Sequence, residues 1–134
     1  MKTLSIRQPF AWLVATGKRE YDIRTWATDY RGKILIHAAK TNCVAAWKDA
    51  QEIEEFDVSD CPKIFGAIIG EAELVDIEWV DELKWYFWFF ENAKLFKKPI
   101  PYKGKLHLFE VDLEKLSQDL NNQKIDNFLN SILM

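Results

Sequence analysis

A chain of 134 residues, 49% of them hydrophobic, is long enough for one compact domain with a core of its own. Its formal net charge of -3 excludes a uniformly basic coat for nucleic acid, and it equally excludes an acidic tail. We therefore expect residues 1–134 to form a single domain.

Cysteine usage and hydropathy exclude further classes. Cys43 and Cys61 lack the CxxC spacing of a zinc site and have only two histidines to help them, so we predict no disulfide framework, no metal and no cofactor. The apolar run YFWFF at 86–90, like every other apolar run in the chain, is too short to cross a bilayer. We expect a cytoplasmic protein with no membrane segment.

The net charge hides an uneven distribution. Residues 1–48 carry nine Lys and Arg against three Asp and Glu, whereas residues 49–93 carry two against thirteen. The last part of the chain is basic again, with Lys97, Lys98, Lys103 and Lys105 close together. These basic segments would form one positive face that steers a polyanion, with the acidic middle facing away. The alternative is that each charge block is simply a solvated surface.

The first third predicts a strand, a helix and a second strand. Residues 4–6 indicate a short strand, and residues 8–17 a helix with Pro9 at its first position and Gly17 just past its end. Residues 19–26 predict a strand. One face of that strand carries alternate side chains, namely Glu20, Asp22, Arg24 and Trp26.

The middle predicts a strand at 33–38, a helix at 42–54 and a long strand at 62–80. Gly66 and Gly70 lie within the long strand, where they indicate a bulge or a sharp bend. A small closing barrel needs such a bend.

The last third predicts an aromatic strand at 85–96, a proline-stiffened connector at 97–104 and a strand at 105–113. Residues 113–134 form an amphipathic helical extension in this interpretation. Strands outnumber helices, which indicates an α+β fold with a small, partly closed mixed β-barrel and flanking helices.

Several short motifs appear in a fixed order along the chain. They are QPFA at 8–11, Gly17, RTW at 24–26, YRG at 30–32 and IHA at 36–38, followed by FGAIIGEAELVDI at 65–77 and PIPYKGKLHLFEV at 99–111. Together they resemble the ASCH domain, a branch of the PUA-like superfamily, over roughly residues 3–113. The resemblance implies a PUA-like fold with a cleft between the barrel and the first helix.

Two positions depart from the family pattern. The family lysine after the glycine falls at Arg19, and the family glutamate falls at Asp22. A desolvated lysine can lose its proton and act as a nucleophile or base, whereas arginine stays protonated. This chain is therefore better suited to binding a ligand than to hydrolysing one.

The resemblance implies that the cleft binds RNA, a modified nucleobase or a nucleotide. The residues expected there are Gln8, Pro9, Phe10, Arg19, Asp22, Arg24, Trp26 and Lys103. Some family members hydrolyse the acetyl group of N4-acetylcytidine, so an amidohydrolase acting on such acylated nucleosides is an alternative, with Asp22 the candidate catalytic residue. A protein-interaction module with a partner on the C-terminal helix is a second alternative.

The residues themselves support part of this function. Asp22 and Arg24 share a strand face, and a carboxylate between guanidinium groups can accept a hydrogen bond from an exocyclic amine of a base. Trp26 and Phe10 offer rings for stacking. The alternative is that Asp22 and Arg24 form a structural salt bridge and that the aromatic side chains belong to the core. His37, in mid-strand, is interpreted as a satisfied, half-buried histidine rather than a catalytic one.

Overall fold

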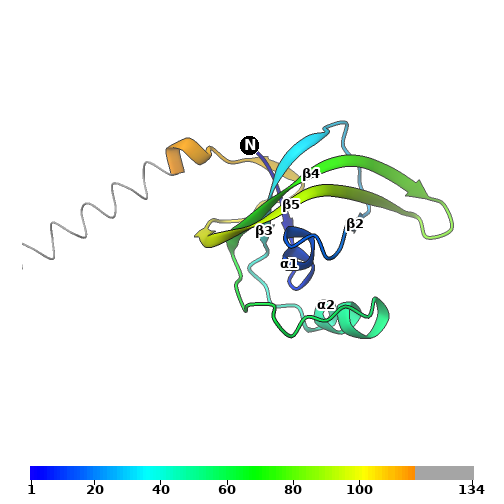
Figure 1. Cartoon of the computed structure of the whole chain (residues 1–134). Helices are drawn as coiled ribbons and strands as arrows, with labels where there is room; N and C mark the ends of the chain where they lie inside the picture. Colours follow the sequence, from blue (N-terminus) through cyan, green and yellow to red (C-terminus); the bar gives the residue numbers. More distant parts are fainter. Residues whose placement is uncertain (117–134) are drawn as a thin grey trace, which may run out of the picture.

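A six-stranded sheet is the framework of the molecule, a computed structural model in which residues 1–116 are described. The strands lie in the order β2-β5-β4-β3-β1-β6 (Figure 1). β1 and β3 run parallel, and the other neighbouring strands run antiparallel. The bounds are β1 Lys2–Ile6, β2 Tyr21–Arg24, β3 Gly32–Ala38, β4 Ala67–Val80, β5 Trp85–Pro101 and β6 Leu108–Glu110.

The sheet is open in the part of the chain that the structure describes. Its two edges, β2 and β6, are four and three residues long, and neither pairs with the other. The α+β class is confirmed, whereas the predicted barrel is not, because closing the sheet would require these short edges to meet.

A β-bulge bends β4 where the sequence predicts one. The register against β3 passes from Ile36↔Gly70 to His37↔Ile68, which leaves Ile69 as an extra residue. At Gly70 a Cβ atom would lie 2.4 Å from the carbonyl oxygen of Lys94, so the two backbones approach each other too closely for any side chain. Gly66 lies just before the strand, with a φ of +68°.

Helix α1 (Phe10–Ala15) is buried except at its first residue. Residues 11–15 are 0–5% exposed, and Leu13 is fully buried. Burying one such large apolar side chain contributes about 1.5–3 kcal/mol. Pro9 precedes the helix instead of occupying its first position, and the peptide bond before it is cis.

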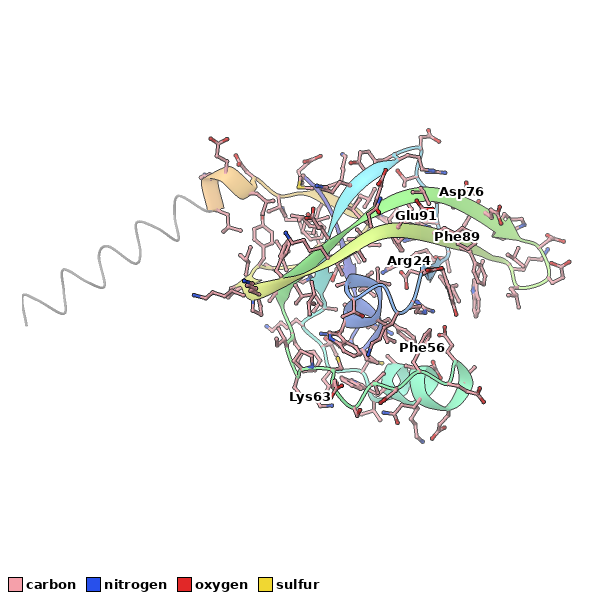
Figure 2. The ribbon with its side chains drawn as sticks, in the orientation of Figure 1. Arg24, Phe56, Lys63, Asp76, Phe89 and Glu91 are labelled. Carbon is pink, nitrogen blue, oxygen red and sulfur yellow. The ribbon has the colours of Figure 1, made fainter. Side chains whose placement is uncertain are left out.

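An excursion between β3 and β4 covers the side of α1 that faces away from the sheet (Figure 1). It contains α2 (Val44–Lys48), which continues as a π-helical turn, η1 (Asp49–Ile53), close to the helix predicted at 42–54. Ala50 is fully buried in the same core cluster as α1. In Figure 2, Phe56 and Lys63 lie on this excursion, while Asp76 and Glu91 lie on the β4–β5 hairpin.

Several predicted boundaries differ from the structure. Residues 62–66 precede β4, residues 105–107 are a loop, and β5 continues through Pro99 to Pro101. Prolines are tolerated there because β2 pairs only with Tyr86–Phe89, so the far end of β5 has a free edge that needs no N–H donor.

The C-terminal helix is predicted at 113–134, and residues 117–134 lie outside the described part. Before them, Asp112 Oδ1 accepts a hydrogen bond from the Lys115 amide at 3.0 Å, as a capping residue does at the start of a helical turn. Within residues 1–116, no helix has the length and apolarity needed to cross a membrane.

Candidate functional site

A cleft of about 1190 Å³ opens beside the N-terminal half of the sheet. Its walls come from β1, the start of α1, β2, His37 of β3 and the loop at 102–107. The cleft slightly exceeds the range of about 300–1,000 Å³ that is typical for small-molecule pockets. It can therefore hold a ligand of nucleotide size together with a flanking group.

Positive charge dominates the lining of the cleft. The cationic side chains are Arg7, Arg24, Lys40, Lys103 and Lys105, and the only carboxylate among the lining residues is Asp22. The acidic middle of the chain, residues 49–93, contributes no acid to this lining. The cleft therefore favours an anionic ligand although the whole chain is negative.

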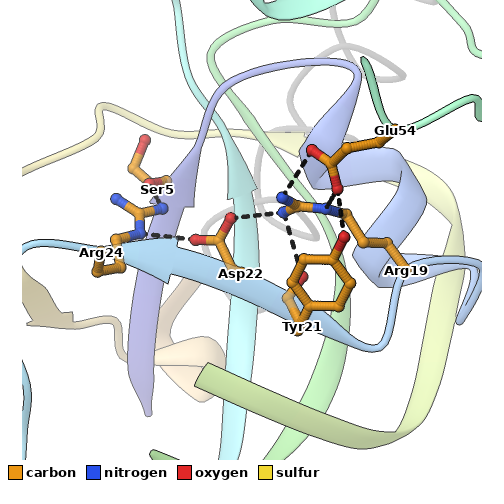
Figure 3. Close-up of polar contacts among 6 residues, drawn as sticks. All are labelled: Ser5, Arg19, Tyr21, Asp22, Arg24 and Glu54. Carbon is orange, nitrogen blue, oxygen red and sulfur yellow. Dashed lines mark hydrogen bonds and ion pairs between the residues drawn. The ribbon is translucent and has the colours of Figure 1, made fainter. Parts of the chain in front are cut away.

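Asp22 joins two arginines at the floor of the cleft (Figure 3). Its Oδ1 accepts a hydrogen bond from Arg19 Nη1 at 3.0 Å, and its Oδ2 accepts one from Arg24 Nε at 2.6 Å. The Asp22 side chain is 7% exposed. Because both oxygens are engaged by guanidinium groups, this carboxylate orients the arginines and is poorly placed to act as a base.

Arg19 does not line the cleft. Its guanidinium group forms a two-pronged ion pair with Glu54, with Nε and Nη2 each 3.0 Å from a carboxylate oxygen. The group also lies between the rings of Phe10 and Tyr21, at 4.3 and 4.4 Å from their centroids. Arg19 thus ties the excursion to α1 and β2.

The Arg19–Glu54 contact also changes the ionisation of its neighbours. Burial lowers the pKa of Arg19, but the hydrogen bond to Glu54 and the charges of Asp22 and Glu54 raise it overall, so the group stays protonated. The Tyr21 hydroxyl also donates to Glu54 (Figure 3), and burial together with that bond raises the pKa of Tyr21.

Gln8 and Pro9 also lie outside the lining of the cleft. Gln8 is fully buried, where its Oε1 accepts a hydrogen bond from the Trp12 amide at 2.9 Å and its Nε2 donates to the Ile64 carbonyl at 3.1 Å. Pro9 is buried beside it. This motif holds the start of α1 against the excursion rather than facing a ligand.

The other predicted site residues do line the cleft, namely Phe10, Asp22, Arg24, Trp26 and Lys103. Arg24 Nη2 donates a hydrogen bond to the Ser5 carbonyl at 2.9 Å, which holds β2 against β1 across the cleft floor. Trp26 is half-buried, and its ring makes edge contacts with Trp88 and His107, each at 4.7 Å between centroids.

Sequence reasoning missed a polar chain in the cleft. Ser5 Oγ lies 2.9 Å from His37 Nδ1, and His37 Nε2 lies 2.7 Å from the Tyr102 carbonyl oxygen. All three residues line the cleft. His37 is hydrogen-bonded at both ring nitrogens, as the sequence predicts, but it is fully buried rather than half-buried. Its position beside Ser5 depends on a register between β1 and β3 that the sequence alone does not reveal.

Burial lowers the pKa of His37, and the hydrogen bond to the Tyr102 carbonyl only partly offsets this effect. The imidazole is therefore neutral at neutral pH. Within residues 1–116, no three His, Cys, Asp or Glu side chains come together as metal ligands.

Known structures share this architecture. The crystal structure of ASCH from Zymomonas mobilis has a TM-score of 0.56 and 13% sequence identity, and the match covers 90% of this chain and 93% of that one. The crystal structure of a mutant form of the Zymomonas mobilis protein has a TM-score of 0.55 and 12% identity, over 91% and 94% of the two chains. No curated protein sequence matches the chain.

The sequence also matches a family profile. The profile of the ASCH domain covers residues 4–100, from β1 almost to the end of β5, which is well over half of the chain. The matched region holds the floor of the cleft, while the loop at 102–107 that closes it lies just beyond. The chain belongs to the ASCH domain family, which is proposed to bind RNA or to act on substrates related to nucleic acids.

Proposed function

We propose that the cleft binds a nucleotide or a short single-stranded RNA through its phosphates and one unstacked base. The observation that carries this function is the charge of the cleft, which is lined by five cationic side chains and one carboxylate. That carboxylate, Asp22, already pairs with Arg24, one of the five, and with Arg19 outside the cleft. Clustered Lys and Arg side chains bind the phosphates of a nucleic-acid backbone well, because these phosphates repeat at regular intervals along the nucleic-acid strand.

Aromatic side chains in the same cleft support a base beside the phosphates. Phe10, Trp26, Phe65 and Tyr102 all line it. One side of the Phe10 ring is already covered by Arg19, and Trp26 is half-buried, so each ring is held in a fixed orientation. Rings held in this way lose little conformational entropy when a base stacks on them.

The role of Asp22 changes in this proposal. Its two oxygens already accept hydrogen bonds from Arg19 and Arg24, so Asp22 positions Arg24 for the ligand instead of reading a base directly. The same bonds weaken the amidohydrolase alternative, which needs Asp22 as a base for an N4-acetylcytidine-like substrate.

A double variant in the closing loop tests the binding function. Lys103→Ala with Lys105→Ala removes two exposed cations from the cleft. We expect affinity for a fluorescently labelled short single-stranded RNA, measured by anisotropy, to fall at least about tenfold at low salt. We also expect the slope of log K against log salt to fall by about 1.4, since each single-strand phosphate contact contributes about 0.7.

The matched control is Lys97→Ala with Lys98→Ala, which removes the same charge from exposed positions of β5 outside the cleft. Its affinity should stay close to that of the unmodified protein. Equal losses in the two double variants would show a general charge effect and would refute binding in the cleft.

A further inference from the structure

We propose that Ser5 and His37 form a nucleophile and general-base pair that hydrolyses an acyl ester whose alcohol part carries a phosphate. The location of the substrate rests on the proposed function, because the phosphate would occupy the same cationic cleft. The nucleophile itself follows from the geometry of the two side chains and does not depend on which ligand the cleft binds.

The hydrogen bonds define the tautomer of the histidine. The Tyr102 carbonyl oxygen can only accept, so His37 Nε2 carries the proton and donates to it at 2.7 Å. His37 Nδ1 is then an unprotonated acceptor, and Ser5 Oγ donates to it at 2.9 Å. A hydroxyl that donates to a histidine oriented by a third group is the arrangement of an activated nucleophile.

The sheet itself brings the pair together. Ser5 and His37 are direct partners in the parallel pairing of β1 with β3, so two rigid strands set their separation. Ser5 is half-buried and lines the cleft, while His37 is 1% exposed. Burial lowers the pKa of His37, which keeps Nδ1 free to take a proton at neutral pH.

Gly104 lets the closing loop pass directly over this pair. A Cβ atom at that position would lie 2.7 Å from His37 Cε1 and 3.2 Å from Ser5 Oγ. Any side chain there would fill the space in front of the hydroxyl. The absence of a side chain lets the loop close over the pair without displacing either His37 or Ser5.

Arg24 supplies positive charge next to the nucleophile. Its Nη2 donates to the Ser5 carbonyl at 2.9 Å, and no group within residues 1–116 accepts a hydrogen bond from its Nη1. This remaining donor suits the negative oxygen that develops when a hydroxyl attacks a carbonyl. Lys103 and Lys105 on the closing loop suit the phosphate of the alcohol part.

The reaction balances with water as its only co-reactant. Ser5 Oγ bonds to the ester carbon, its proton passes to His37 Nδ1, and the carbonyl electron pair moves onto oxygen. The bond from that carbon to the alcohol oxygen breaks, and the alcohol leaves with the proton from Nδ1. Water then attacks the acyl group on Ser5 while Nδ1 takes a proton from it. Collapse releases a carboxylic acid and returns the proton to Ser5.

The hydrogen-bond partner of His37 Nε2 favours an ester substrate over an amide substrate. In a triad with an aspartate, the carboxylate stabilises the imidazolium that forms during attack. Here a neutral carbonyl oxygen of Tyr102 occupies that position, so the base is weaker. A weaker base is enough for an ester, because its alcohol oxygen departs more readily than the nitrogen of an amide, which has to be protonated before it can leave.

The first test traps the nucleophile without any assumption about the ligand. Diisopropyl fluorophosphate forms a bond from an activated serine oxygen to phosphorus and releases fluoride. We expect label on Ser5, located by peptide mass spectrometry, and a rate at least about 100-fold lower in His37→Gln, as for the loss of a general base. That variant keeps an N–H donor for the Tyr102 carbonyl, and a thermal melt checks that it is folded.

Ser59→Ala is the matched control, because this exposed serine donates to Asp57 and lies outside the cleft. Labelling of Ser5 should be unchanged in Ser59→Ala and absent in Ser5→Ala. Failure to label Ser5 in the unmodified protein, or equal labelling of Ser59, would overturn the inference.

The second test compares two esters in the unmodified protein. We expect kcat/KM for the ribose acetyl ester of adenosine monophosphate to exceed that for the same ester of adenosine by at least about tenfold, the effect of one charge-assisted hydrogen bond. Equal kcat/KM values for the two esters would refute the proposal that the alcohol part of the substrate carries a phosphate. If RNA binding persists while Ser5 does not label, the inference fails and the proposed function stands; the reverse result refutes the proposed function alone.

Discussion

At the scale of single residues, an arginine changes the chemistry of the site. Arg19 stands where the resembling family pattern has a lysine, and in this chain it is 3% exposed, paired with Glu54 and Asp22. A permanently charged guanidinium whose three nitrogens all donate hydrogen bonds cannot act as a nucleophile or base. The position is therefore structural, and any reactive group has to come from the residues that line the cleft.

Asp22 accepts hydrogen bonds from both Arg19 and Arg24 and so connects the two guanidinium groups. We therefore expect Asp22→Asn to destabilise the protein. The amide offers one acceptor instead of two and places an N–H group beside a guanidinium. Since Arg19 keeps Glu54 and Arg24 keeps the Ser5 carbonyl, we expect the free energy of unfolding to fall by about 1–3 kcal/mol, measured in urea.

The control for this substitution is Asp81→Asn. Asp81 pairs with Lys84 in the β4–β5 turn, where both side chains are exposed. Exposed ion pairs contribute little, so no measurable change in stability is expected. An effect on unfolding no larger for Asp22→Asn than for Asp81→Asn would contradict the structural role of Asp22.

His37 should make stability depend on pH in a defined direction. Burial lowers its pKa below the ordinary value of 6.5, so the unfolded chain binds a proton that the folded chain does not. Its contribution is complete above pH 6.5 and is lost as the pH falls towards the folded pKa. The slope from one such group is at most about 1.4 kcal/mol per pH unit.

Urea unfolding at a series of pH values just below neutrality measures this dependence. His37→Gln cannot titrate and keeps a donor for the Tyr102 carbonyl, so its curve should be flatter over the same range. Identical slopes for the two proteins would assign the dependence to other groups.

At the scale of elements, the cleft exists because separate segments meet there. β1 and β2 form its floor, and the loop at 102–107 closes it after β5 has run its full 17 residues. At the bulge in β4, Gly70 lies against both Lys94 of β5 and Ala15 of α1. The absence of a side chain at Gly70 therefore sets how closely β5 and α1 approach β4. The position of the loop thus depends on a backbone contact outside the lining of the cleft.

Gly70→Ala tests this contact. The new methyl group would lie 2.4 Å from the Lys94 carbonyl oxygen and 2.9 Å from Ala15 Cβ, so backbone has to move. We expect a loss of about 1–3 kcal/mol in the free energy of unfolding, as for overpacked cores. A calorimetric or urea measurement that shows no loss would mean that β4 and β5 can separate there without cost.

At the scale of the whole molecule, charge is divided between two regions. The cleft collects cations from the two basic parts of the chain, whereas acidic Asp76 and Glu91 lie on the β4–β5 hairpin, outside its lining (Figure 2). A net charge of -3 therefore coexists with a site for anions. Such a layout orients an approaching polyanion as well as attracting it.

Much of the fold follows from local sequence signals. The strand at 33–38, the helical region at 42–54 and the bulge near Gly70 are confirmed. Each of them depends on neighbouring residues or on a glycine that its backbone requires. The predicted end of β5 is wrong, because prolines are permitted on an unpaired edge, and edges are set by strand order.

The sequence by itself determined the class of the fold, the family and the shared strand face of Asp22 and Arg24, because periodicity and motif spacing are properties of neighbouring residues. Only the tertiary structure decided that Arg19 turns towards Glu54, that the sheet stays open and that Ser5 meets His37 in the cleft. These contacts join residues more than 30 positions apart, and the register that aligns β1 with β3 is set by packing of the whole sheet.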